Sequence, residues 1–173
     1  MQVFDVLMEL PEIMYTEIGR IAAAHSYLEY ALSLIVQDQL RLDPKKARIA
    51  VRDPRSCDTF EMIKDLAALD GISIPKEYKN LAALLAKCKS ERDSLAHGIW
   101  LIEPKSRAIL LRLTAGTWQP DIGMRGKVKR KAKPEGTLFA ATKFESIHAD
   151  IMSAIDLALS LREHIKTAMD EKT

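Results

Sequence analysis

The sequence predicts an all-α fold, an antiparallel bundle of four to five helices with a small β-hairpin inserted before the last helix. Three observations support this prediction. Apolar residues recur at alternating steps of three and four over long segments, which is the helical period. Proline and glycine breakers separate those segments. One stretch, about residues 99–114, is instead short and rich in bulky apolar residues, as paired strands are. At 173 residues the chain is predicted to form a single domain, 1–173.

The first predicted helix begins at Pro11, since proline suits a first helical position, and continues to about Leu42, before Asp43 and Pro44. Its apolar stripe consists of Ile18, Ile21, His25, Leu28, Leu32 and Ile35.

A second helix is expected from about Ser56 to Leu69, ended by Asp70 and Gly71. Its predicted buried side holds Phe60, Ile63, Leu66 and Ala67. A third helix is expected to open at Pro75. Its repeating positions are Tyr78, Leu81, Leu85, Cys88, Arg92 and Leu95.

The predicted hairpin, about 99–114, has its turn at 104–107. Residues 115–141 are polar and interrupted by glycine and proline, so we predict a loop there, which contains the basic run "RGKVKRKAK". The last helix is expected from Thr142, which with Glu145 has the spacing of a capping box, to near Met169. Its apolar positions are Phe144, Ile147, Ile151, Ile155, Leu161 and Ile165.

Composition limits the classes of function. The formal net charge is only +2 although 29% of residues are charged, so any electropositive surface must be local. Cys57 and Cys88 lack the spacing of a zinc site or a disulfide framework, so we expect no metal, no cofactor and a reducing cytoplasm. The most apolar window, 18–36, contains charged residues, so we expect no membrane span, and the acidic N-terminal segment does not fit a signal peptide.

An arginine and a histidine separated by four residues occur twice, as Arg20 with His25 and as Arg92 with His97. His25 lies within an apolar stripe, so we predict a hydrogen-bonded core or interface histidine, with no polar group in the preceding "IAAA" to orient it. His97 lies in the last turn of a helix with Asp93 one turn earlier, where a carboxylate can orient an imidazole. A structural role of His97 also stays open, because the helix macrodipole stabilises a cationic histidine near a C-terminus by roughly 0.3–1 kcal/mol.

Arg92 occupies a position of the apolar rhythm, where a buried charge requires an anion nearby. Glu29, a carboxylate of a partner subunit and a phosphate are three candidates for that anion.

The segment "RDSLAHGIW", preceded by a helix with "SYLEYAL" and followed by a hairpin and a last helix, resembles the HEPN superfamily (higher eukaryotes and prokaryotes nucleotide-binding), in particular its Arg-x4-6-His ribonuclease branch. The resemblance spans roughly residues 12–169, but its specific part is Arg92, Asp93 and His97 with the residues that follow. Asp93 stands where the family more often has asparagine. The resemblance implies a metal-independent endoribonuclease that acts as a homodimer, a toxin or defence effector with a cognate antitoxin as a further partner.

The residues suit this chemistry, because RNA supplies its own nucleophile, the 2′-hydroxyl. His97 can act as general base or acid, Arg92 can hold the phosphate, and Asp93 can orient His97, with Ser94 as a minor phosphate contact. Within the basic run, Lys129, Arg130 and Lys131 are candidate RNA contacts, and a solvated loop is the alternative. A catalytically inactive module that binds nucleotide or RNA, and a structural or interaction protein, remain as alternative functions.

Overall fold

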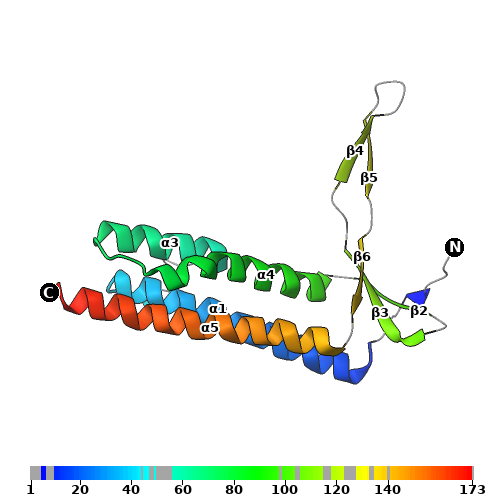
Figure 1. The fold of residues 1–173 in the computed structure, drawn as a ribbon, viewed down its shortest axis with the longest axis horizontal. Coiled ribbons are helices and arrows are strands. Elements are labelled where there is room, and N and C mark those ends of the chain that lie inside the picture. The colour runs from blue at the N-terminus through cyan, green and yellow to red at the C-terminus, as the bar shows by residue number, and fades with distance from the viewer. Residues whose placement is uncertain are drawn as a thin grey trace. The chain divides into compact units, whose positions relative to one another are not determined.

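The computed structural model describes residues 5–6, 10–43, 45–46, 49, 56–97, 99–103, 106–114, 118–122, 128–132, 135–139 and 141–172. Most of these residues are helical (Figure 1), so the coarse prediction, a mainly helical chain of the all-α class, is confirmed. The α-helices are α1 (Glu12–Gln39), α3 (Ser56–Leu69), α4 (Leu81–His97) and α5 (Ala141–Asp170). A short 3₁₀ helix, η1 (Lys76–Asn80), follows Pro75 and leads directly into α4. None of the described helices combines the length and the apolar character needed to cross a membrane.

The chain folds as two compact units. The sheet unit comprises Met1–Ile18 and Asp93–Glu145, and the helical unit comprises Gly19–Arg92 and Ser146–Thr173. One domain over residues 1–173 stays a prediction. The boundaries fall within α1, α4 and α5 and not in linkers, so no shift in composition marks them.

The core of the helical unit follows the predicted apolar stripes. Each fully buried leucine or isoleucine stabilises the fold by about 1.5–3 kcal/mol relative to an exposed one. The largest side chains that are less than 2% exposed are Ile21, Leu28, Leu32, Ile35, Ile63, Leu81, Leu85, Ile147, Ile151, Leu161, Ile165 and His25. The stripes predicted for the first, third and last helices therefore lie inside this unit for most of their length.

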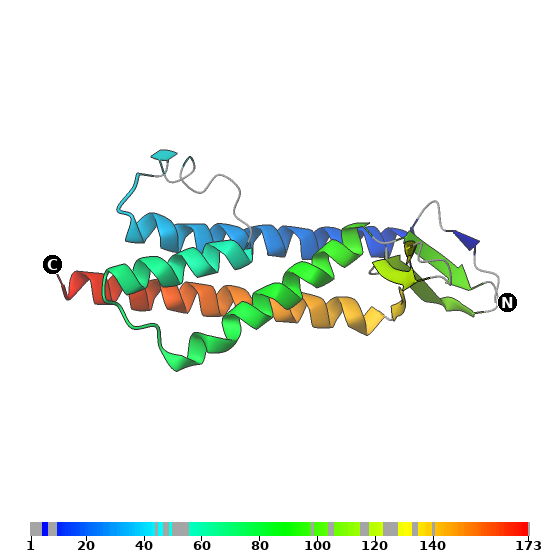
Figure 2. The same cartoon turned by 90° about the horizontal axis from the view of Figure 1, so that it is seen from above.

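Polar contacts connect η1 and the helix α4 that follows it with α5. The hydroxyl groups of Tyr78 and Ser160 lie 2.9 Å apart, and Lys87 donates a hydrogen bond of 2.6 Å to Asp150. The numbering rises along α4 as it falls along α5, so these two helices are antiparallel. By contrast, α1 and α5 run in the same direction in both views (Figures 1 and 2). Apolar periodicity identifies the buried face of a helix but not its direction, so the sequence did not predict the direction of this pair.

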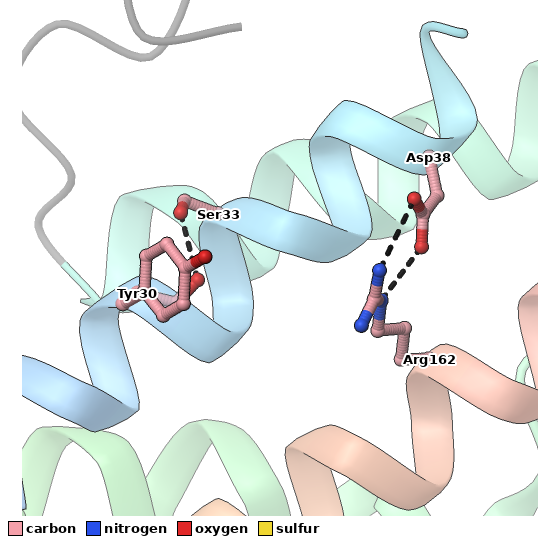
Figure 3. Close-up of polar contacts among 4 residues, drawn as sticks. All are labelled: Tyr30, Ser33, Asp38 and Arg162. Atoms are coloured by element: carbon pink, nitrogen blue, oxygen red, sulfur yellow. Dashed lines mark hydrogen bonds and ion pairs between the residues drawn. The ribbon is translucent and has the colours of Figure 1, made fainter. Parts of the chain in front are cut away.

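An ion pair joins the C-terminal parts of α1 and α5 within the helical unit (Figure 3). Arg162 donates from Nε to Asp38 Oδ2 at 2.6 Å and from Nη2 to Asp38 Oδ1 at 3.3 Å. Within α1, the Ser33 hydroxyl donates a hydrogen bond of 2.7 Å to the carbonyl oxygen of Tyr30. The hydrogen bond to Asp38 raises the pKa of Arg162 above its ordinary value, so this guanidinium remains charged.

The end of α3 matches its prediction. Gly71 has a φ of 64°, a left-handed conformation that favours glycine, and its amide donates to the carbonyl of Ala68 at 3.1 Å. Lys172 donates to the carbonyl of Asp70 at 2.6 Å, which connects this turn to the C-terminal end of the chain.

The sheet unit contains the described strands. They are β1 (Asp5–Val6), β2 (Ile99–Glu103), β3 (Ser106–Thr114), β4 (Trp118–Ile122), β5 (Val128–Ala132) and β6 (Glu135–Phe139). They form a four-stranded sheet in the order β1-β2-β3-β6 and a two-stranded sheet of β4 and β5, and each of these strand pairs is antiparallel. Trp100 and Phe144 are both buried and stack with ring centroids 6.4 Å apart.

The sequence predicts a loop over 115–141, and the structure corrects this, since β4, β5 and β6 lie within that stretch. Strand β5 is rich in lysine and arginine, a composition that does not indicate a strand in the sequence. The pairing of β6 with β3 also joins segments that are distant in sequence, and a local pattern does not report such a partner.

Candidate functional site

Helix α4 holds every residue of the predicted catalytic motif. Arg92, Asp93 and Ser94 are half-buried and His97 is exposed at the last residue of the helix. Between them, Leu95 is 2% exposed. Arg92 is the last residue of its segment in the helical unit, whereas Asp93, Ser94 and His97 belong to the sheet unit. The motif therefore lies on one continuous helix that contributes to both units.

Asp93 and His97 are one helical turn apart in the sheet unit, so the helical period places them on the same face of α4. This agrees with a carboxylate that orients the imidazole. The glycine that follows, Gly98, lies outside the described residues.

Arg92 lies near Glu29 in the helical unit. Its Nη2 atom is 4.0 Å from Glu29 Oε1, and the two side chains are 29% and 25% exposed. Glu29, one of the three candidate anions for Arg92, thus lies close to its guanidinium in the structure. The ion pair connects α4 with α1 and lowers the cost of placing a guanidinium in a partly buried position.

The same carboxylate lies near His25. The distance from His25 Nδ1 to Glu29 Oε1 is 3.7 Å, and His25 is only 1% exposed. The predicted burial of this histidine is confirmed, and the nearby polar group is Glu29, which lies outside the preceding "IAAA" segment. Because Glu29 follows His25 by four residues on α1, the helical spacing alone was a sufficient signal for this contact.

Arg20, the partner of His25 in the repeated spacing, is exposed on α1. The two arginines therefore differ in their surroundings, since Arg92 is half-buried beside Glu29. The structure brings His25 together with Glu29 and Arg92, so the histidine of one pair lies near the arginine of the other.

Residues Lys129, Arg130 and Lys131 lie in β5, where they are register partners of Asp121, Pro120 and Gln119 in β4. Their backbone is thus part of a two-stranded sheet of the sheet unit. Residues 125–127 and 133, which complete the predicted basic run, lie outside the described residues.

Two other groups described in the helical unit, Cys88 and Lys87, are not activated as nucleophiles. Burial raises the pKa of the Cys88 thiol to about 11, which suppresses the reactive thiolate. The hydrogen bond to Asp150 raises the pKa of Lys87, so its amine stays protonated. Within the described part of the chain, histidine, cysteine and carboxylate side chains form no cluster of three that could hold a metal ion.

A pocket of about 390 Å³ lies elsewhere in the helical unit and contains none of the predicted site residues. Its lining is largely apolar, with Lys64 and Lys79 among it. The lining residues are Phe60, Lys64, Ala68, Ile72, Ile74, Pro75, Tyr78, Lys79 and Ala82. This pocket therefore does not enclose Arg92 or His97 and is no evidence for a reaction there.

Comparison of the chain with protein-family models, with curated proteins and with solved structures gave no match. The resemblance to the HEPN superfamily accordingly rests on the amino-acid sequence alone.

Proposed function

We propose that the protein is a metal-independent endoribonuclease of the HEPN type that acts as a homodimer. The observation that supports this proposal is the position of the motif on α4, where Arg92 is half-buried beside a carboxylate and His97 is exposed at the helix end. The HEPN-like bundle, with a hairpin before its last helix, and a role as a toxin or defence effector in the cytoplasm belong to the same proposal.

The reaction is the attack of the RNA 2′-hydroxyl on the adjacent phosphorus. One imidazole removes the hydroxyl proton, a bond forms between the 2′-oxygen and phosphorus, and the bond to the 5′-oxygen breaks. A second proton donor supplies the proton that the 5′-oxygen takes up, and the products carry a 2′,3′-cyclic phosphate and a 5′-hydroxyl. In this scheme His97 transfers protons, Arg92 binds the phosphoryl oxygens, Asp93 orients His97 and Ser94 adds a phosphate contact.

Helix geometry favours two copies of the chain in this reaction. An α-helix turns by about 100° per residue, so residues five apart, such as Arg92 and His97, project about 140° apart around the axis. One α4 helix is therefore poorly suited to aim both side chains at the same phosphate. An isologous dimer can place Arg92 of one chain near His97 of the other and also supplies two histidines.

One observation favours a second candidate function. Glu29 already provides an anion for Arg92, so the placement of this arginine requires no phosphate. A structural or interaction protein would then use the arginine for an ion pair and the histidine for the helix end.

The test is cleavage of a fluorescent RNA in the presence of EDTA, with analysis of the product ends. We expect a 2′,3′-cyclic phosphate, and Arg92→Ala and His97→Ala should each lower turnover by at least the roughly 10²-fold typical of a lost catalytic group. Arg20→Ala is the matched control, because Arg20 has the same spacing to a histidine but is exposed on α1. It should retain turnover.

Circular dichroism and light scattering on the same samples separate chemistry from folding and assembly. Folded, dimeric variants without turnover would support the proposal. A monomeric wild type at micromolar concentration, or wild-type inactivity on RNAs of varied sequence, would contradict it.

A further inference from the structure

Glu29 Oε1 lies between two nitrogen-containing side chains of the helical unit. It is 3.7 Å from His25 Nδ1 on the same helix and 4.0 Å from Arg92 Nη2 on α4. The imidazole is buried, whereas the carboxylate and the guanidinium are each about one quarter exposed. One carboxylate oxygen is thus shared by a core residue and by the arginine of the proposed site.

The position of this carboxylate is restrained from the core side. His25 is 1% exposed and cannot follow Glu29 into solvent, so the contact between them favours the conformation in which Glu29 points along the α1 surface toward Arg92. Both distances exceed those of hydrogen bonds, so the ion pair between Glu29 and Arg92 can be exchanged for another anion. The guanidinium, which is 29% exposed, remains reachable by a second anion.

A phosphate that approaches Arg92 has to share the guanidinium with Glu29 or displace it. Both anions carry negative charge, and like charges within a few ångströms repel each other most strongly where water is partly excluded. Glu29 therefore stabilises the unliganded arginine and opposes the phosphate-bound one. A ligand shifts an equilibrium only through such a difference between states.

We propose that Glu29 is an autoinhibitory counter-ion that competes with RNA phosphate for Arg92. This inference rests on the proposed function, because it takes Arg92 as a phosphate ligand. It adds that the affinity for RNA is set below what the guanidinium alone would give, and that His25 contributes by holding Glu29 in place. His25 is in this sense a positioning residue.

The experiment measures binding of a fluorescent 2′-O-methyl oligoribonucleotide, which lacks the nucleophile, by anisotropy in EDTA. Glu29→Gln removes the charge and keeps the shape, and it should tighten binding by about twofold to fivefold, the range expected for a partly exposed ion pair. Arg92→Gln should weaken binding. The double variant should bind like Arg92→Gln, because Glu29 acts only through Arg92.

Glu77→Gln is the matched control, since Glu77 is an exposed glutamate of the helical unit and loses the same charge. It should change the affinity by less than about 1.5-fold, which measures the effect of net charge alone. If Glu29→Gln does not fold, as judged by circular dichroism, Glu29→Asp keeps the charge but withdraws it from Arg92. That variant should also bind RNA more tightly than wild type.

The outcomes separate this inference from the function on which it rests. Weaker binding by Arg92→Gln without tighter binding by a folded Glu29 variant overturns the autoinhibitory role and leaves the ribonuclease proposal intact. Unchanged binding by Arg92→Gln, or no binding by wild type, overturns both. A gain in Glu29→Gln that persists in the double variant would show a general charge effect and would also reject the inference.

Discussion

The ion pair between Asp38 and Arg162 allows a quantitative test of how the helical unit is held together. We propose to replace Asp38 by Asn and Arg162 by Met, singly and together, and to measure the coupling energy in a double-mutant cycle. The two hydrogen bonds, of 2.6 and 3.3 Å, join α1 to α5, so the perturbation affects two helices that run parallel and share the core (Figure 3).

The magnitude follows from geometry and exposure. The side chains are 25% and 21% exposed, between the fully exposed pairs that contribute about 0.2–1 kcal/mol and buried charged hydrogen bonds that contribute about 1.5–3 kcal/mol. We therefore expect a coupling of about 1.5 kcal/mol. Arg162→Met alone should destabilise by about 2 kcal/mol, because it leaves a partly buried carboxylate without its guanidinium. For a chain of this size the melting temperature should fall by roughly 4–8 °C.

Urea unfolding followed by circular dichroism gives the free energies of unfolding for the cycle. The control is the ion pair of Lys64 and Glu61, which has the same shortest distance of 2.6 Å but side chains that are 44% and 58% exposed. Its coupling should be at most about 0.5 kcal/mol. Equal couplings in the two cycles, or no coupling between Asp38 and Arg162, would refute the reasoning from burial.

Two further predictions concern charge and titration. Neutralising residues 129–131 together should weaken RNA binding at low salt and flatten its salt dependence, because fewer counterions are released, and an unaltered slope in a salt titration would assign these side chains to solubility alone. The Cys88 thiol should react with a thiol reagent at pH 8 far more slowly than Cys57, since burial raises the pKa of Cys88 to about 11 and Cys57 is half-buried. Equal reaction rates of the two thiols would contradict the burial of Cys88. Because its pKa in the folded protein exceeds the ordinary value of 9.0, this thiol should lower the free energy of unfolding as the pH rises from about 9 toward 11.

The sequence was sufficient to locate the helices and most of their buried faces. The three-four rhythm identified Ile21, Leu28 and Leu32 in α1 as core, and all are fully buried or nearly so. Helical periodicity is a local property, since residues one turn apart share a face whatever the rest of the chain does. The same locality explains the small errors at helix ends, such as α5 beginning at Ala141, one residue before the predicted start.

Properties that depend on distant partners were harder to predict. The parallel direction of α1 and α5, the pairing of β6 with β3 and the two-unit organisation all arise from contacts between remote segments. The environment of Arg92 is intermediate. The sequence showed that a half-buried arginine needs an anion and named Glu29 among the candidates, but only the fold places that carboxylate 4.0 Å away.

Arg92 and His97 each have a structural explanation that does not involve the other. Glu29 accounts for a half-buried guanidinium in the helical unit, and the helix dipole accounts for an exposed histidine at the end of α4, with a stabilisation of about 0.3–1 kcal/mol. The ribonuclease proposal differs because it requires both residues in one reaction, since phosphate binding without proton transfer leaves RNA uncut. Separate structural roles therefore predict unequal effects of Arg92→Ala and His97→Ala, confined to stability. A shared reaction predicts comparable losses of turnover in two variants that both remain folded.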